Sequence, residues 1–381
     1  LTGFSATSVS RIVEELKGQD LVVEAPGNLE SGPGRPPTLL SLNDRGWFAV
    51  AVNVFPDRVH GGLTDLGGRV LADETLWVTD PAPEAVLALV GRVVEQLRRD
   101  APNPERVVGI GLAVPGVVDA RRGEIRYSPP IGWRAVDVPS VLARYTSLPV
   151  VLDNWVSARA RAERWFGGAT ECRDLVYVNL GEGISAGVII NDRILQGAQG
   201  HAGEIGHMSI QKDGPLCNCG NRGCLESVCG IPAIMRKVKN EISIIPDNDP
   251  LKKLWAEKGE ISIEDIISSS RIKNSYSHNL LKQVAEYIGK AIANVINFYN
   301  PECVFIGGKM APAVKYFIDI IKTAVNTHAF PEIARSTDIQ ISSLQEKAGV
   351  MGACALVLRD LFKPDSDILE DVQQALNYEE A

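Results

Sequence analysis

One histidine and three cysteines stand close together in residues 207–224, and they constrain the fold of this chain more than any other feature. They are His207, Cys217, Cys219 and Cys224, with Gly214, Gly220 and Gly223 among them. Three thiolates and one imidazole complete a tetrahedral zinc site and leave no position for a catalytic water. The glycines allow so short a loop to fold back around one ion. The spacing predicts a structural Zn²⁺; the alternative is a set of ordinary small buried thiols.

The composition is that of a globular protein. The chain has 381 residues, 45% of them hydrophobic and 23% charged, which is enough for two or three domains with substantial cores. No run of about 18 apolar residues occurs, so no membrane span is predicted. Seven cysteines, an odd number, favour a reducing cytoplasm over a disulfide framework. The net charge of −8 gives no overall attraction to nucleic acid, so DNA binding requires a local surface.

Residues 1–43 have the pattern of a small separate unit. The segment Ser5–Leu16 places its apolar residues on one helical face. Short apolar runs at 21–23 and 38–40 enclose a turn-rich loop at 26–37 and look like the two strands of a wing. The chain begins without Met in the middle of this motif, so we expect a further helix upstream.

The predicted helix carries candidate DNA contacts, because short polar and cationic side chains suit phosphates and base edges in a major groove. The candidates are Ser5, Thr7, Ser8 and Arg11, with Arg35 in the wing, where arginine suits a minor groove. Residues 1–43 hold three basic and five acidic side chains, which weakens the electrostatic case. The alternative is a plain packing helix.

From Trp47 onward, strand and helix patterns alternate as in an α/β fold. We expect strands at 48–54, 59–65, 69–78, 107–114, 149–152, 175–180, 184–191, 193–196 and 303–306, and helices at 83–100, 156–166, 277–299, 312–326 and 349–361. The segments 52–54 and 68–71 resemble 178–180 and 192–195, which indicates a duplicated lobe. The sequence therefore predicts lobes at 44–154 and 155–363 with a ligand cleft between them. Whether a C-terminal helix at 364–381 packs on the first lobe stays open.

Several motifs carry a resemblance to a known family. They are Gly109-Ile-Gly-Leu-Ala-Val-Pro-Gly116, Gly203-Glu-Ile-Gly-His207, Cys217-Asn-Cys-Gly-Asn-Arg-Gly-Cys-Leu-Glu226 and Asn300-Pro-Glu-Cys-Val-Phe-Ile-Gly-Gly308. With these, residues 44–362 resemble the ROK family, which joins transcriptional repressors and sugar kinases. The resemblance implies a two-lobed actin-like, hexokinase-like (ribonuclease H-like) fold. Residues 1–43 resemble the winged helix-turn-helix of the family's repressors, truncated at its N-terminus.

The first phosphate turn departs from that of the family's kinases. Those kinases open the first lobe with Asp-x-Gly-Gly-Thr, whereas this chain has Asn53-Val-Phe-Pro-Asp57. Phe55 and Pro56 replace the glycines, and Pro56 has no N–H to offer a phosphate. Asp57 adds a negative charge where phosphate would bind.

Two further departures concern the second phosphate turn and the base. Glu182 stands in the second turn, where it would repel a polyphosphate. The catalytic Asp of the kinases aligns with Trp155, which cannot accept a proton. The neighbouring Asp153 is one residue out of place and is expected to point the other way. Together, the departures predict that this chain is not an enzyme.

The sugar-holding residues of the family are retained. By resemblance, contacts to sugar hydroxyls are assigned to Asn154, Glu204, His207 and Glu226, with Gly116 lining the same pocket. His207 would use one ring nitrogen for zinc and the other for the ligand or a supporting partner. Trp155 leaves two alternatives: it stacks on a pyranose face, or it fills the pocket. Glu204 and Glu226 could instead only support the zinc loop.

The resemblance implies a sugar-responsive transcriptional regulator, most simply a repressor, with a catalytically inactive effector domain. Its expected partners are double-stranded operator DNA, a small sugar effector and a second copy of itself in a homodimer. Two alternatives remain open: an ATP-dependent sugar kinase, and a regulator controlled by a partner protein without sugar binding.

Overall fold

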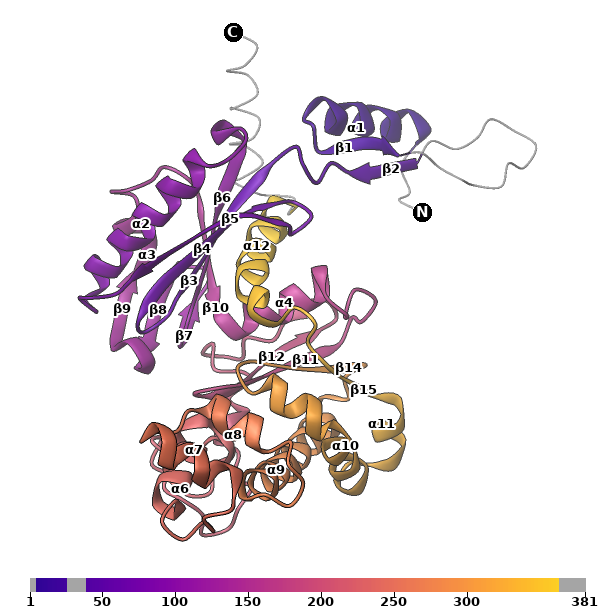
Figure 1. The fold of residues 1–381 in the computed structure, drawn as a ribbon. Helices are drawn as coiled ribbons and strands as arrows, with labels where there is room; N and C mark the ends of the chain where they lie inside the picture. Colours follow the sequence, from indigo (N-terminus) through magenta and orange to yellow (C-terminus); the bar gives the residue numbers. More distant parts are fainter. Residues whose placement is uncertain (1–4, 26–38, 363–381) are drawn as a thin grey trace. The chain divides into compact units, whose positions relative to one another are not determined.

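The computed structural model describes residues 5–25 and 39–362, and the chain divides into two compact units. Unit 1 comprises Leu1–Ala162 with Lys347–Ala381, and unit 2 comprises Glu163–Glu346. Figure 1 traces the elements of each unit. The boundaries expected at 43/44 and 154/155 stay predictions. The expected helix at 364–381 and the wing loop with Arg35 lie outside the described residues.

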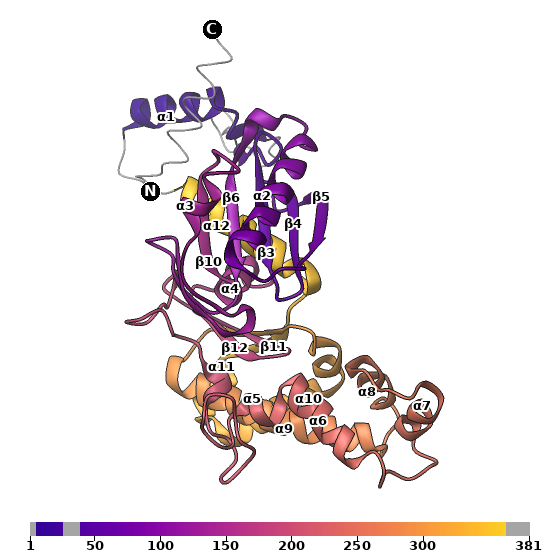
Figure 2. The same cartoon turned by 90° about the vertical axis from the view of Figure 1, so that its left-hand side faces the viewer.

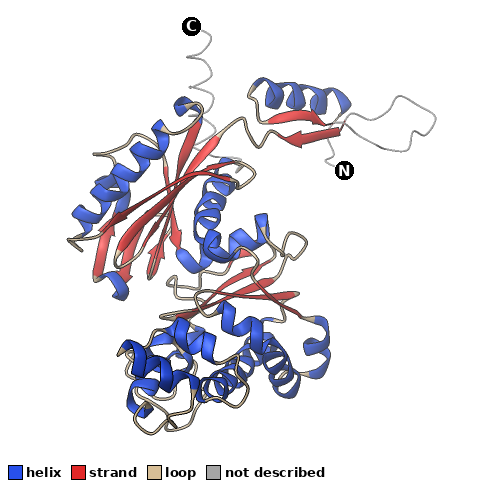
Figure 3. Cartoon of the chain, in the orientation of Figure 1, coloured by secondary structure: helices blue, strands red, loops and turns tan. Residues whose placement is uncertain are grey.

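The N-terminal part of unit 1 is one helix followed by a two-stranded ribbon (Figure 3). Helix α1 (Ala6–Gly18) begins after Ser5, whose side chain accepts a hydrogen bond from the Ser8 N–H, and no described residue of α1 is buried. Strands β1 (Val22–Ala25) and β2 (Leu39–Leu42) pair antiparallel. The Trp47 indole N–H donates to the Gln19 carbonyl at 2.8 Å, which anchors this part to the body of unit 1. The helix and both wing strands are therefore present where the pattern predicts them.

The body of unit 1 is a mixed five-stranded sheet in the order β10-β6-β3-β4-β5. The strands are β3 (Phe48–Val54), β4 (Arg58–Asp65), β5 (Val70–Trp77), β6 (Val107–Val114) and β10 (Val150–Asn154). Strands β3, β4 and β5 are antiparallel neighbours, whereas β6 and β10 run parallel to β3. Every residue of β3 and β6 is buried, as expected of strands covered on both faces.

Two helices cover opposite faces of this sheet (Figure 1). They are α2 (Pro83–Arg99) and α12 (Ala348–Leu361). A side chain at Gly61 of β4 would contact α2, whereas one at Gly62 would contact Val350 of α12. Because successive strand residues point to opposite faces, the sheet lies between the two helices.

The remaining elements of unit 1 are short. They are β7 (Val117–Asp119), β8 (Glu124–Ser128), β9 (Trp133–Asp137) and α3 (Val138–Leu142), with the 3₁₀ turns η1 (Pro104–Arg106) and η2 (Pro129–Ile131). Helix α4 (Trp155–Phe166) begins in unit 1 and ends in unit 2. Strands β7, β8 and β9 form a separate antiparallel sheet. The sequence prediction missed this sheet because its strands are only three to five residues long.

Unit 2 contains a second mixed sheet in the order β13-β12-β11-β14-β15. Its strands are β11 (Leu175–Leu180), β12 (Ile184–Ile190), β13 (Arg193–Ile194), β14 (Cys303–Gly307) and β15 (Asp338–Ile341). Its helices are α5 (Leu225–Cys229), α6 (Ile231–Glu241), α7 (Pro250–Lys258), α8 (Ile263–Ser269), α9 (Tyr276–Tyr299), α10 (Ala311–His328) and α11 (Pro331–Ser336), with η3 (Ile205–His207) and η4 (Gln345–Lys347, which ends in unit 1) as 3₁₀ turns. Figure 2 shows α9 and α10 side by side in this unit.

The two sheets share one topology. In each, three antiparallel strands follow one another along the chain, and two later strands add parallel to the first of them. Asn53 and Asn179, which the internal similarity pairs, lie at the ends of the corresponding strands β3 and β11. The chain is therefore an α/β protein with two mixed sheets of the same connectivity, as the duplicated pattern predicts.

Candidate metal centre and ligand-binding residues

The four predicted metal ligands meet in unit 2. His207 ends the 3₁₀ turn η3, Cys217 and Cys219 lie in the following loop, and Cys224 immediately precedes α5. The loop is closed by short antiparallel bridges, including one between Ser209 and Cys224. Gly223 has a φ of +71°, and a side chain there would overlap the backbone of Gln211. The glycine is therefore required for the turn that brings Cys224 back to the histidine.

The distances among these four residues fit a tetrahedral zinc ion. Zinc lies about 2.3 Å from sulfur and about 2.0–2.1 Å from nitrogen, which puts two sulfurs about 3.8 Å apart and sulfur and nitrogen about 3.6 Å apart. Cys219 Sγ and Cys224 Sγ are separated by 3.7 Å, and Cys217 Sγ lies 3.6 Å from His207 Nδ1. All four ligand atoms lie within 4.8 Å of one another. The cluster is consistent with the zinc site that the sequence predicts.

The pKa values of two thiols in the cluster are shifted in opposite directions. Burial, together with the neighbouring thiols, raises the pKa of Cys224 to about 12. The backbone N–H of Asn221 lowers the pKa of the exposed Cys219 thiol. A divalent cation among the sulfurs would hold these thiols as thiolates, because metal-bound thiols lose their protons.

Two carboxylates expected to touch a sugar lie beside the cluster. Glu204 Oε2 is 3.8 Å from His207 Nε2, the ring nitrogen opposite the one that faces Cys217. Glu226 Oε2 accepts a hydrogen bond of 3.0 Å from the Ile184 N–H. Glu226 is thereby tied to the turn at 181–185, and Glu182 of that turn is exposed.

In unit 1, Asn154 connects the end of β10 to the loop after β6. Its Nδ2 donates to the Gly116 carbonyl at 2.6 Å, and its Oδ1 accepts from the Val156 N–H at 2.7 Å. The side chain therefore caps the start of α4 and fixes Gly116 at the same time. The structure thus brings Asn154 and Gly116 together, as the resemblance implies.

Asp153 is held away from any role as a free base. Its side chain is 5% exposed and lies 3.4 Å from Arg161 Nη2, and it also accepts from the Asn154 N–H at 2.8 Å. Burial lowers the pKa of Arg161 to about 10, although the charge of Asp153 opposes that shift. A buried carboxylate with two structural partners supports the fold rather than accepting a proton from a substrate.

Trp155 packs into a row of aromatic and cationic groups. Its ring centre is 5.7 Å from that of Phe55, and the Arg159 guanidinium lies 5.3 Å from its centre. Arg58 in turn lies 4.4 Å from the Phe55 ring. Phe55 and Trp155, which are 100 residues apart in the chain, therefore contact each other directly.

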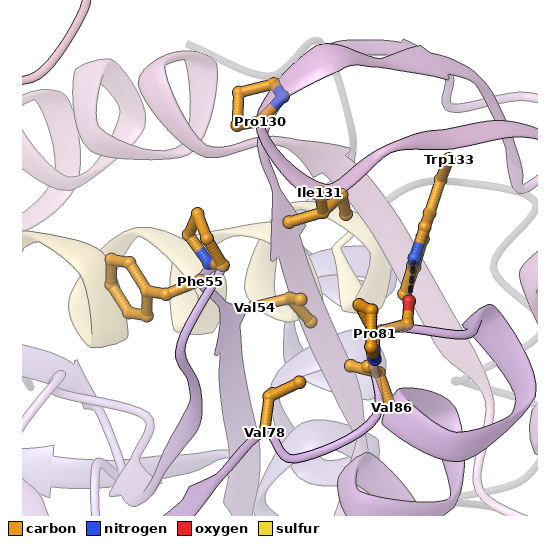
Figure 4. A pocket seen from close by; sticks show the side chains of 9 residues that line it. Val54, Phe55, Val78, Pro81, Val86, Pro130, Ile131 and Trp133 are labelled. Carbon is orange, nitrogen blue, oxygen red and sulfur yellow. Dashed lines mark hydrogen bonds between the residues drawn. The ribbon is translucent and has the colours of Figure 1, made fainter.

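The turn after β3 forms an apolar wall. Asn53, at the end of β3, is 1% exposed, and neither of its amide atoms has a hydrogen-bond partner among the described residues. Phe55 and Pro56 line a pocket together with side chains from the β5–α2 connection and the η2–β9 segment (Figure 4). This pocket was not predicted from the sequence.

The predicted DNA contacts of α1 are all exposed. Ser5, Thr7, Ser8 and Arg11 are exposed, and Ser5 and Ser8 also share a hydroxyl–hydroxyl hydrogen bond of 2.9 Å. Lys17 pairs with Glu24 and Glu14, and these hydrogen bonds raise its pKa. Its charge is therefore largely neutralised, and Arg11 remains as the cation on the exposed face of α1.

No helix in residues 5–25 and 39–362 is both long and apolar enough to cross a membrane.

Comparisons with known proteins match this arrangement to one family. The sequence model of the ROK family matches residues 49–360. The xylose repressor of Caldicellulosiruptor bescii is 30% identical over 95% of this chain and 90% of its own length. A glucokinase of Halalkalibacterium halodurans is 33% identical over 66% of this chain and 76% of its own. The crystal structure of a ROK family transcriptional regulator, a homolog of the E. coli MLC protein, superimposes with a TM-score of 0.84 at 29% identity, covering 97% of this chain and 92% of that one.

Proposed function

The chain belongs to the ROK family, and on that premise we propose that it is a repressor of sugar-metabolism genes whose kinase-like body senses a sugar without catalysis. The observation that carries this proposal is the extent of the similarity. The alignment with the xylose repressor covers 95% of this chain, so the residues outside the alignment are too few to include all of residues 1–43. The glucokinase match covers a much smaller share of the chain. The chain thus resembles repressors of the family over most of its length.

The DNA-binding part of the proposal is that residues 1–43 form a winged helix-turn-helix with α1 as its recognition helix. Its support is the helix and ribbon of unit 1 and the exposed side chains of Thr7 and Arg11. A homodimer would place two such units on adjacent half-sites of an operator. Arg35 is proposed to enter a minor groove from the wing.

The body is proposed to have an actin-like fold without kinase activity. The two mixed sheets are consistent with actin-like lobes. Phosphoryl transfer needs backbone donors around the phosphates and a base near the sugar hydroxyl. Pro56 offers no donor, Glu182 is exposed as a negative charge, and Asp153 is ion-paired and buried. These features support a non-enzymatic role.

The residues proposed to hold the sugar are those that the family resemblance assigns to it: Asn154, Gly116, Glu204, His207 and Glu226. Zinc on His207 Nδ1 would fix the ring so that Nε2 faces Glu204, which orients two of these groups at once. A sugar that binds two arrangements of the lobes unequally shifts the dimer between them and changes its affinity for DNA.

DNA binding by α1 is tested by anisotropy titrations of the full-length protein against DNA from upstream of its own gene. Arg11→Ala is expected to weaken binding and to reduce its salt dependence by about one phosphate contact. Arg99→Ala, an exposed arginine of α2, is the matched control and should bind as the wild type does. Equal loss of affinity in both variants would contradict the assignment of α1.

The glucokinase relative makes sugar kinase activity the second candidate. Incubation with labelled ATP and a panel of hexoses and pentoses decides between them. No sugar phosphate is expected. Product that is lost on changing Asp153 to Ala, in a variant that still melts cooperatively, would establish a kinase.

A further inference from the structure

Unit 1 contains a pocket of about 160 Å³ that none of the zinc, sugar or DNA candidate residues lines (Figure 4). Three chain segments form it: the end of β3 with its turn, the β5–α2 connection with the first turn of α2, and the segment from η2 into β9. Its lining residues are Val54, Phe55, Pro56, Val78, Pro81, Val86, Pro130, Ile131 and Trp133. Val54, Val86 and Trp133 are buried, and the three prolines are exposed around them. All nine side chains are apolar except for the indole N–H.

The pocket has few hydrogen-bond donors to offer a ligand. The Trp133 N–H already donates to the Pro81 carbonyl at 2.8 Å, drawn as the dashed line in Figure 4. The Phe55 and Val78 N–H groups donate to carbonyls of the β3–β4 turn at 2.8 and 2.9 Å. The prolines have no N–H. An occupant therefore gains from burying apolar surface rather than from polar contacts, and a phosphate group is disfavoured here.

The size of the pocket suits one small ring. A dry apolar cavity of about 150 Å³ in another protein binds benzene, so a volume near this value accommodates a ring of about six heavy atoms. A nucleotide base with its ribose is far larger than this space.

The pocket adjoins the unit 1 residues proposed to hold the sugar. Phe55, on one wall, is the ring that contacts Trp155, which follows Asn154 in the chain. On the other side, Gly116 packs so closely on Ser128 that an added Cβ would lie 2.6 Å from the Ser128 Cα. Pro130 of the pocket lies two residues after Ser128. The pocket is thus linked to the residues proposed to hold the sugar through Phe55, which contacts Trp155, and through the segment from Ser128 to Pro130.

We propose that this pocket is a subsite for a small aryl or branched-alkyl aglycone, so that the effector is a glycoside rather than a free sugar. The proposal rests on the sugar site proposed above. The turn that would bind phosphate in a kinase here presents Phe55 and Pro56, and an apolar substituent matches these side chains. Burial of one phenyl ring predicts on the order of 30-fold tighter binding than that of the methyl glycoside.

Calorimetric titration of the full-length protein tests the subsite. Matched methyl and phenyl β-glycosides of xylose, glucose and N-acetylglucosamine are compared, together with the free sugars and with phenol alone. The expected result is a gain of about 30-fold for the phenyl over the methyl glycoside of the sugar that binds. Equal affinities of the two glycosides would overturn the proposal and leave the sugar site intact. Binding of phenol with no gain for any phenyl glycoside would also overturn it. If no sugar or glycoside binds, the sugar part of the proposed function fails, and this proposal fails with it.

A second experiment fills the pocket with a larger side chain. Ile131→Trp places a large ring in the half-buried wall and is expected to abolish the phenyl gain while leaving affinity for the methyl glycoside unchanged. Leu71→Trp, at an exposed position of β5, is the matched control and should keep the gain. Val78→Phe replaces Ile131→Trp if the latter does not melt cooperatively. A phenyl gain that survives in a folded filled variant would contradict the assignment.

Discussion

The two units share one sheet topology, but the segments that connect their strands and helices differ in chemistry. They carry polar and metal-binding side chains in unit 2 and apolar side chains in unit 1. In unit 2, the segment around η3 and α5 brings together a histidine, three cysteines and two carboxylates, all able to bind metal or hydroxyl groups. In unit 1, the turn after β3 places Phe55 and Pro56 in the wall of an apolar pocket, and Phe55 also contacts Trp155 at the start of α4. A duplicated scaffold therefore does not require a duplicated site: the sheets fix where chain segments meet, and the residues on those segments decide what they bind.

The zinc cluster should give the largest effect, because the polar site of unit 2 depends on it. Cys219→Ser is expected to lose the metal and to destabilise the protein by about 3 to 5 kcal/mol. Metal analysis should find about one zinc per wild-type chain. Cys172→Ser, a partly exposed cysteine outside the cluster, should retain the metal. Purified wild-type protein without zinc would contradict the metal site of unit 2 and, with it, the chemical contrast between the two units.

The buried ion pair of unit 1 should give the next largest effect. Asp153→Asn leaves the buried Arg161 without its counter-charge and is expected to cost about 3 to 5 kcal/mol in the free energy of unfolding. The exposed pair Glu95–Arg99 is the control, because Glu95→Gln should change the free energy of unfolding by less than about 1 kcal/mol. Denaturant unfolding measures both. If Asp153→Asn is as mild as the control, Asp153 is not the structural group that the geometry indicates.

A lone buried carboxyl in unit 2 gives a smaller, pH-dependent effect. Burial raises the pKa of Glu163, although hydrogen bonds from Ser342 and the Gly168 N–H oppose the shift. The folded protein thus holds this proton more tightly than the unfolded chain does. Its contribution to stability is fully present below the ordinary glutamate pKa near 4.5 and is lost as pH rises through the raised pKa. Glu163→Gln should remove this slope in melting curves between pH 4 and 8, and an unchanged slope would contradict it.

The last substitution, in unit 1, is expected to produce no kinase activity. Trp155→Asp places an acid at the position that the family resemblance aligns with the kinase base, but Pro56 still lacks a backbone donor for phosphate. No sugar phosphate should form from ATP with the variant. Turnover at any measurable rate would mean that the unit 1 turn still accepts a nucleotide, and that the two units are more alike than their surfaces indicate.

The sequence predicted most of the secondary structure from its apolar patterns. Helices α2, α9, α10 and α12 and the strands of both large sheets, except β15, lie within a few residues of their predicted positions. The metal cluster was also predictable, because its four ligands lie within 18 residues of one another and together complete the coordination that zinc prefers. The ROK assignment followed from the same motifs and is confirmed by the family match.

The apolar pocket was not predictable from the sequence. Its walls come from three segments far apart in the chain, represented by Phe55, Val78 and Trp133, and no local pattern shows that these segments meet. The proximity of Asn154 and Gly116, which lie 38 residues apart, was expected only from the family resemblance, because no local pattern indicates their hydrogen bond. The sheet of β7, β8 and β9 escaped because its strands are too short for a periodic signal.

The central claim is that a sugar bound by this body changes DNA binding. Retention of upstream DNA by the full-length protein, measured with and without xylose, glucose, N-acetylglucosamine and their glycosides, tests it most directly. The account predicts specific retention that one sugar or glycoside alters by at least about 5-fold, the lower range of typical coupling between sites. Specific retention that no sugar changes, or sugar phosphorylation without specific retention, would contradict it.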